Sequence, residues 1–185
     1  MGLFDFFSGG ADGQLKRHSK RAMNLNAQAE DREASLHWLA QDGSEQAILG
    51  LLGRFTVTYE HQMKDLNEKQ LVFDLLDELG ESVCEPIKTW SRSAPKFARP
   101  LQLVDKYQGE EATVSLLIDM LSLENDPFKP EKKRQILIKL AEYTDERVVP
   151  AIEECLRDFD EGIRYAAVEA ALAQPDESVQ GHLAE

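Results

Sequence analysis

Apolar residues recur along the chain at the three- and four-residue spacing of amphipathic helices. Clear examples, one from each half, are Leu71, Leu75, Leu76 and Leu79, and then Ile136, Leu137 and Leu140. The only β-like run, from Phe55 to Tyr59, is too short and too isolated to seed a sheet. The pattern therefore predicts an all-α protein.

Turn residues divide this helical pattern into a recurring pair of helices. The turns are expected at Asp42-Gly43, Gly80-Glu81, Gly109-Glu110, Asp145-Glu146 and Pro175-Asp176. A narrow apolar stripe follows each turn, from Ile48 to Leu52 in the first pair and around Val179 and Leu183 in the last. Because such a stripe can be buried only against a neighbouring pair, we predict an α-solenoid (superhelix) of about five antiparallel helix pairs. It would span residues 25–185.

The C-terminal third carries a specific resemblance. Residues 145–152, DERVVPAI, precede Leu156, Asp158, Asp160 and the alanine-rich run from Ile163 to Leu172. In residue type and order this stretch resembles a HEAT repeat of the kind first named for phycobilisome lyases. The resemblance implies an armadillo-type fold in which the second helix of each pair lines a concave surface. It implies no enzyme activity, because the shared residues are packing and loop residues.

The acidic turn within this stretch invites a metal-site interpretation. Asp158, Asp160 and Gly162 partly match a calcium loop, but that motif needs glycine at its sixth position, where this chain has Ile163. We interpret the turn as a structural motif instead. Asp158 and Asp160 are expected to cap the next helix and to pair with Arg164.

No other residue cluster points to catalysis, a cofactor or a metal. The four histidines lie in separate helix pairs, without the spacing of metal ligands. Cys84 and Cys155 lie on apolar stripes of non-adjacent pairs, so we predict buried, unpaired and inert thiols. The sequence therefore predicts a protein that is not an enzyme and carries no cofactor.

Charge separates the N-terminal arm, residues 1–24, from the rest of the chain. The formal net charge is −13, from 34 acidic and 21 basic residues. One basic stretch carries no acid, and it contains Lys16, Arg17, Lys20 and Arg21. An acidic body repels phosphate backbones, so we expect no nucleic-acid partner.

The structure of this arm is left open by its residues. Glycines in residues 8–13 suggest a flexible joint. Beyond them, either one long helix from about Gln14 to Gln41 or a disordered basic tail with a helix starting near Asn26 is possible. We interpret the apolar start, Leu3 to Phe7, as a tail or packing cap; the alternatives are a docking peptide and a membrane-surface element. We expect no stable membrane association and a bacterial, cytoplasmic protein.

The leading functional hypothesis is a non-catalytic scaffold that binds another protein through the concave face of the solenoid. Candidate partner-binding residues on second helices, opposite the apolar stripes, are Lys88, Arg92, Asp119, Ser122, Glu153 and Arg157. One alternative is an accessory enzyme resembling bilin lyases, which would need a pigment pocket. Another is nucleic-acid binding through the basic arm, by analogy with alkylpurine DNA glycosylases built from HEAT-like pairs.

Overall fold

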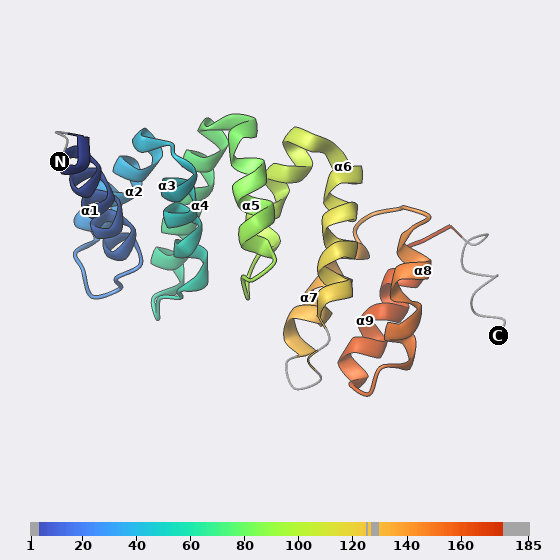
Figure 1. The fold of residues 1–185 in the computed structure, drawn as a ribbon. Coiled ribbons are helices and arrows are strands. Elements are labelled where there is room, and N and C mark those ends of the chain that lie inside the picture. The colour runs from blue at the N-terminus through green and yellow to red at the C-terminus, as the bar shows by residue number, and fades with distance from the viewer. Residues whose placement is uncertain (1–3, 125, 127–129, 176–185) are drawn as a thin grey trace. The chain divides into compact units, whose positions relative to one another are not determined.

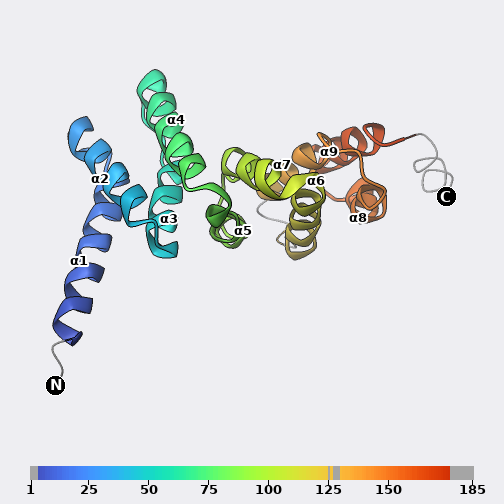
Figure 2. The same ribbon diagram turned by 90° about the horizontal axis from the view of Figure 1, so that it is seen from above.

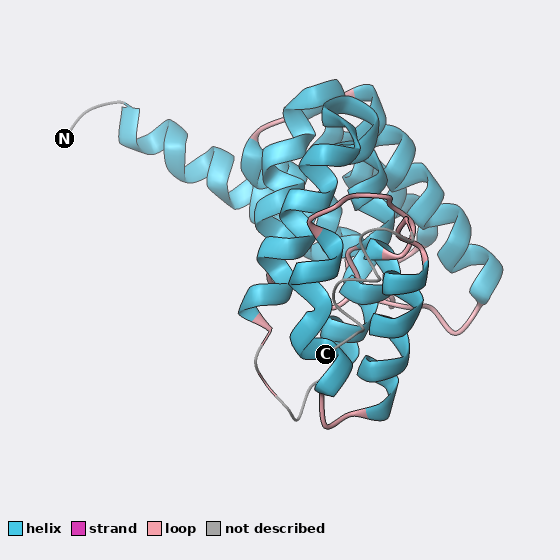
Figure 3. Ribbon diagram, turned by 90° about the vertical axis from the view of Figure 1, so that its right-hand side faces the viewer, coloured by secondary structure: helices cyan, strands magenta, loops and turns pink. Residues whose placement is uncertain are grey.

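The computed structural model describes residues 4–124, 126 and 130–175, and every regular element in these ranges is a helix (Figures 1 and 3). The all-α prediction is confirmed for this part of the chain. None of the described helices is long and apolar enough to cross a membrane. The α-helices are α1 (Phe4–Ala22), α2 (Ala29–Asp42), α3 (Glu45–Leu52), α4 (Gln62–Glu78), α5 (Cys84–Ser91), α6 (Ala98–Leu123), α7 (Pro130–Leu140), α8 (Val148–Ile152) and α9 (Glu161–Leu172). Short 3-10 helices follow α3, α4 and α8: η1 (Gly53–Thr56), η2 (Gly80–Val83) and η3 (Glu153–Arg157).

Three glycines mark turns that the sequence predicted. Gly43, Gly80 and Gly109 have φ values of 63°, 66° and 83°, a backbone conformation that side chains with a Cβ rarely adopt. Gly43 separates α2 from α3, and Gly80 separates α4 from α5. Gly109 interrupts α6, so the first part of this helix corresponds to the predicted first helix of a pair and the second part to the second helix of the same pair. The predicted turns at these positions are confirmed.

The chain divides into two compact units close to this interruption: unit 1 extends to Tyr107, and unit 2 begins at Gln108. In unit 1, α1, α2 and α3 pack on one another, α2 also contacts α4, and α3 contacts α4 and α5. Helices α1 and α2 lie side by side and run in opposite directions (Figure 2). The His18 ring stacks on Trp38 with the ring centroids 4.3 Å apart. Fully buried leucines and isoleucines fill the core, among them Leu36, Leu39, Leu51, Leu52, Leu76 and Ile87.

The N-terminal arm differs from two of our expectations. Residues 8–13 lie within α1, so they form no flexible joint. Helix α1 ends at Ala22 and α2 begins at Ala29, so there is no single helix from Gln14 to Gln41. The second alternative is half right: a helix does start near Asn26, but the basic stretch before it is helical rather than a disordered tail. Each glycine costs a helix about 1 kcal/mol relative to alanine. Packing of the second half of α1, where Ala22 is fully buried, offsets part of that cost because a helix extends cooperatively once nucleated. Leu3 lies outside the described residues.

In unit 2, α9 packs on both α7 and α8. Pro130 opens α7, because the first turn of a helix needs no backbone N–H from that residue. The Asp160 side chain caps α9 by accepting a hydrogen bond of 2.9 Å from the Ile163 backbone N–H. The predicted fifth second helix, with Val179 and Leu183, lies outside the described residues.

Candidate functional site

A surface hollow of about 360 Å³ in unit 2 contains two of the predicted partner-binding residues, Ser122 and Glu153. Ile118 and Leu121 line it from α6, and Pro150 and Ala151 line it from α8. The hollow follows from the amphipathic pattern of α8. Val149 and Ile152 turn into the core, which leaves Pro150 and Ala151 on the outward side. We call this the unit 2 hollow.

The charged groups beside this hollow are held by hydrogen bonds. Lys133, which also lines it, donates a hydrogen bond of 2.6 Å to the Asp158 carboxylate. Burial alone would raise the pKa of Asp158, but hydrogen bonds from Lys133 and from the Asp160 N–H outweigh it and lower that pKa. The Cys155 thiol has a raised pKa, chiefly because it is buried, although Lys133 opposes the shift. This cysteine is therefore a neutral thiol and a poor nucleophile at neutral pH.

The aspartate turn beside the hollow differs in detail from our expectation. Asp160 caps α9, but Arg164 does not bond to either carboxylate. Its Nη1 donates instead to the backbone carbonyls of Asp158, at 2.8 Å, and Phe159, at 2.9 Å. The Asp158 carboxylate instead accepts a hydrogen bond from Lys133 on α7. The sequence around Asp158 did not predict this partner. In the described residues, no group of three or more potential metal ligands forms.

The other predicted partner-binding residues lie elsewhere. Asp119 and Arg157 are exposed in unit 2, on α6 and η3, but do not line the hollow. In unit 1, Lys88 lies on α5 and Arg92 follows directly after its last residue; Lys88 pairs with Glu85 at 2.8 Å. Cys84, on the same helix, is buried and unpaired, as is Cys155, and both parts of that prediction are confirmed.

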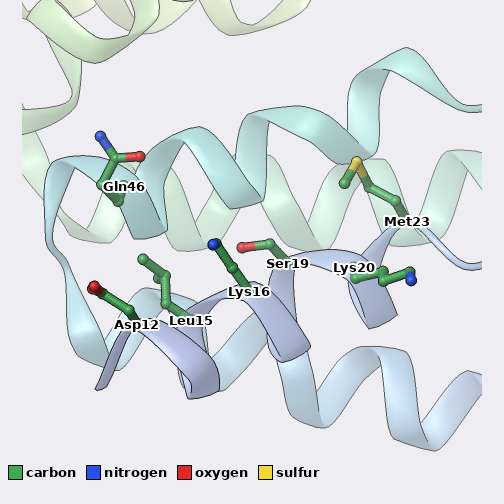
Figure 4. A pocket seen from close by; sticks show the side chains of 7 residues that line it. All are labelled: Asp12, Leu15, Lys16, Ser19, Lys20, Met23 and Gln46. Atoms are coloured by element: carbon green, nitrogen blue, oxygen red, sulfur yellow. The ribbon is translucent and has the colours of Figure 1, made fainter. Parts of the chain in front are cut away.

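A second hollow, of about 420 Å³, lies between α1 and α3 in unit 1 (Figure 4). We call it the α1–α3 groove. Leu15, Lys16 and Ser19 rise from α1 toward α3, and Gln46 faces them from the start of α3. The two helices approach as closely as glycine allows: a Cβ on Gly50 would lie 2.5 Å from Ser19 Oγ. Asp12, Lys20 and Met23 also line the groove. The sequence singled out its two lysines, but not the apolar residues between them.

Unit 1 also contains a buried cluster of charged residues that sequence reasoning missed. Arg54 is fully buried, and its Nε donates to Glu68 at 2.9 Å while its Nη2 donates to Asp65 at 2.8 Å. Arg32, only 2% exposed, donates from Nε to the same glutamate at 3.1 Å. Lys69 completes the cluster with a bond of 2.6 Å to Asp65.

The cluster lowers the pKa of both its carboxyl groups. Burial alone would raise the pKa of Glu68, but hydrogen bonds from Arg32 and Arg54 outweigh burial. For Asp65, hydrogen bonds from Lys69, Arg54 and the Tyr59 N–H likewise outweigh it. The arginines also close two loops, since Arg32 donates to the Ala27 carbonyl and Arg54 to the Val57 carbonyl. The cluster therefore holds loops in place and presents no group to a ligand.

The chain matches no protein-family model, and the searches of curated proteins and of solved structures give no significant match. The function must therefore be argued from the geometry of these surfaces.

Proposed function

We propose that this chain is a protein-binding scaffold built as a HEAT-like α-solenoid, with the unit 2 hollow as a contact surface. The solenoid part is supported by a recurring offset between hydrogen-bonded residues within each unit. In unit 1, Arg99 bonds to Gln70 and Lys106 to Asp77, both 29 residues apart. In unit 2, Gln174 bonds to the Tyr143 carbonyl, 31 residues away. Stacked helix pairs of about 30 residues would produce such an offset.

The observation that carries the binding role is the composition of the unit 2 hollow. Ile118, Leu121 and Pro150 provide an apolar wall, and the exposed Glu154 stands at its edge beside Glu153. An apolar wall next to carboxylates suits a protein segment in which an apolar anchor side chain is flanked by lysine or arginine. Cys155 provides no reactive thiolate, which favours binding over chemistry.

A photo-crosslinking experiment tests this proposal. The crosslinking residue p-benzoylphenylalanine would replace Ser122 or Glu154 in the full chain, and Thr144, an exposed residue of unit 2 that does not line the hollow, as the control. We expect one protein partner to be captured from both positions in the hollow and not from Thr144. Its capture from Ser122 should weaken when Glu154→Arg is introduced, because like charges then face each other.

Equal capture from all three positions would contradict the proposal. So would a partner whose capture is unchanged by Glu154→Arg. Recovery of a nucleic acid or a pigment from the hollow would contradict the scaffold function and indicate a different one.

A further inference from the structure

Helix α9 presents an apolar surface to solvent. Tyr165, Val168 and Leu172 are 66%, 45% and 72% exposed. Their spacing of three and four residues places them on one side of the helix, and we call them the α9 stripe. In the described part of unit 1, by contrast, only Met63 and Leu66 are large exposed apolar residues, and both lie on α4. A contiguous apolar surface of this kind is typical of an interaction site.

Acidic residues flank the stripe. Glu161 and Glu169 lie four residues before and after Tyr165, so they border the same side of α9, and both are exposed. In the described structure neither carboxylate forms an ion pair. Arg164, the only base on this helix, is turned back to the carbonyls of Asp158 and Phe159. The stripe is therefore an apolar surface bordered by negative charge.

The α1–α3 groove has the complementary character. Leu15 and Met23 line it, and Lys16 and Lys20, one turn apart, stand along the same face of α1 (Figure 4). Among the described residues neither ammonium group has an ion-pair partner. One acidic residue, Asp12, also lines the groove, but from Gly13 to Ala22 the helix carries four basic residues and no acidic one, so the charge along the groove is positive on balance. The groove thus combines an apolar lining with positive charge.

We propose that the α9 stripe of one copy of the chain docks in the α1–α3 groove of a second copy. Tyr165, Val168 and Leu172 would cover Leu15 and Met23, while Glu161 and Glu169 would face Lys16 and Lys20. Two stripes placed against each other would instead oppose like charges, which disfavours a symmetric pairing through α9. A contact between two different surfaces leaves one stripe and one groove open on the outer copies, so association continues beyond a dimer until a ring closes or as an open chain.

Sedimentation velocity of the full chain over a concentration series tests this association. We expect the average mass to rise from that of the 20.9 kDa monomer toward dimers and larger species. A groove variant, Lys16→Glu with Lys20→Glu, and a stripe variant, Val168→Ser with Leu172→Ser, should each weaken association by at least about tenfold. All four residues substituted are on the surface, so circular dichroism should show both variants folded.

Mixing these two variants gives the decisive result. The groove variant keeps an intact stripe and the stripe variant keeps an intact groove, so an equimolar mixture should form one contact and stop at twice 20.9 kDa. As an independent check, adding Glu161→Lys and Glu169→Lys to the groove variant should restore association, because the charges are exchanged across the contact.

Three outcomes would overturn the proposal. The first is a wild-type chain that stays monomeric at all concentrations. The second is association that is lost in the stripe variant but kept in the groove variant, which would indicate a symmetric contact through α9. The third is a mixture of the two variants that remains monomeric although both are folded.

Discussion

The two units differ in the side chain that is buried against an interhelical loop. In unit 1, loop carbonyls accept hydrogen bonds from the buried Arg32 and Arg54, and both arginines also donate to Glu68. In unit 2, the side chain buried against a loop is the neutral Gln174. Its amide nitrogen donates to the carbonyls of Tyr143 and Ala170. Its amide oxygen accepts from the Asp145 backbone N–H at 2.9 Å.

The difference matters for stability because a charge and an amide cost different amounts to bury. A buried ion pair is expensive to desolvate and becomes strongly destabilising when one partner is removed. An unpaired amide or carbonyl costs less. Loss of one residue that holds a loop should therefore lower the free energy of unfolding more in unit 1 than in unit 2.

The largest effect is expected for Glu68→Ala. This change leaves Arg54 with Asp65 alone and Arg32 without a carboxylate, so it should lower the free energy of unfolding by about 3–5 kcal/mol. Tryptophan fluorescence during denaturation reports on unit 1, since Trp38 and Trp90 both lie there. Glu78→Ala, on the exposed end of α4, should change stability by less than about 0.5 kcal/mol. Similar values for the two variants would contradict a critical role for the cluster.

Acid should weaken the same cluster without a mutation. The pKa values of Glu68 and Asp65 are lowered on folding, so both carboxylates stabilise unit 1 fully above their ordinary values of 4.5 and 3.8. That contribution is lost as the pH falls below these values toward the lowered ones. The stability gap between wild type and Glu68→Ala should therefore narrow in acid, measured by denaturation at a series of pH values. A gap that stays constant would show that Glu68 is not linked to folding.

A smaller loss of stability is expected for Gln174→Ala in unit 2. The change leaves the Tyr143 carbonyl and the Asp145 N–H without this side chain as a partner and should cost about 1–3 kcal/mol. Thermal unfolding followed by circular dichroism measures it, with Thr144→Ala, at an exposed position in the same loop, as the control. If Gln174→Ala destabilised the protein as much as Glu68→Ala, the expectation that removing a buried amide costs less than breaking a buried ion pair would be wrong.

The smallest effect is expected for Arg164→Ala, at about 1 kcal/mol, because Arg164 bonds to two carbonyls that water can reach once it is removed. Arg157→Ala, at an exposed position on η3, is the matched control and should be close to neutral. Chemical denaturation of both variants separates a hydrogen-bonding role from a general effect of charge. Equal losses of stability in the two variants would show that the hydrogen bonds of Arg164 make no measurable contribution to the free energy of unfolding.

The helices and their turns could be predicted from the sequence because both depend on residues close together in the chain. The stripe from Ile48 to Leu52 predicted α3, and the turns at Gly43, Gly80 and Gly109 followed from glycine chemistry. For the candidate site, Ser122 and Glu153 were predicted from their position opposite apolar stripes; both line the unit 2 hollow, and their role in binding stays a prediction. Lys133 was missed because its partner, Asp158, is 25 residues away.

By itself, then, the sequence determined an all-helical chain, the places where its helices turn, and an acidic body preceded by a basic N-terminal stretch. These properties follow from spacing, backbone preference and net charge, which need no knowledge of neighbours in space. Only the tertiary structure decided which charges are buried. Arg32 and Glu68 are 36 residues apart and look like ordinary surface residues of two amphipathic helices. They meet because α2 packs on α4, and an ion pair is specified by that packing rather than by either helix alone.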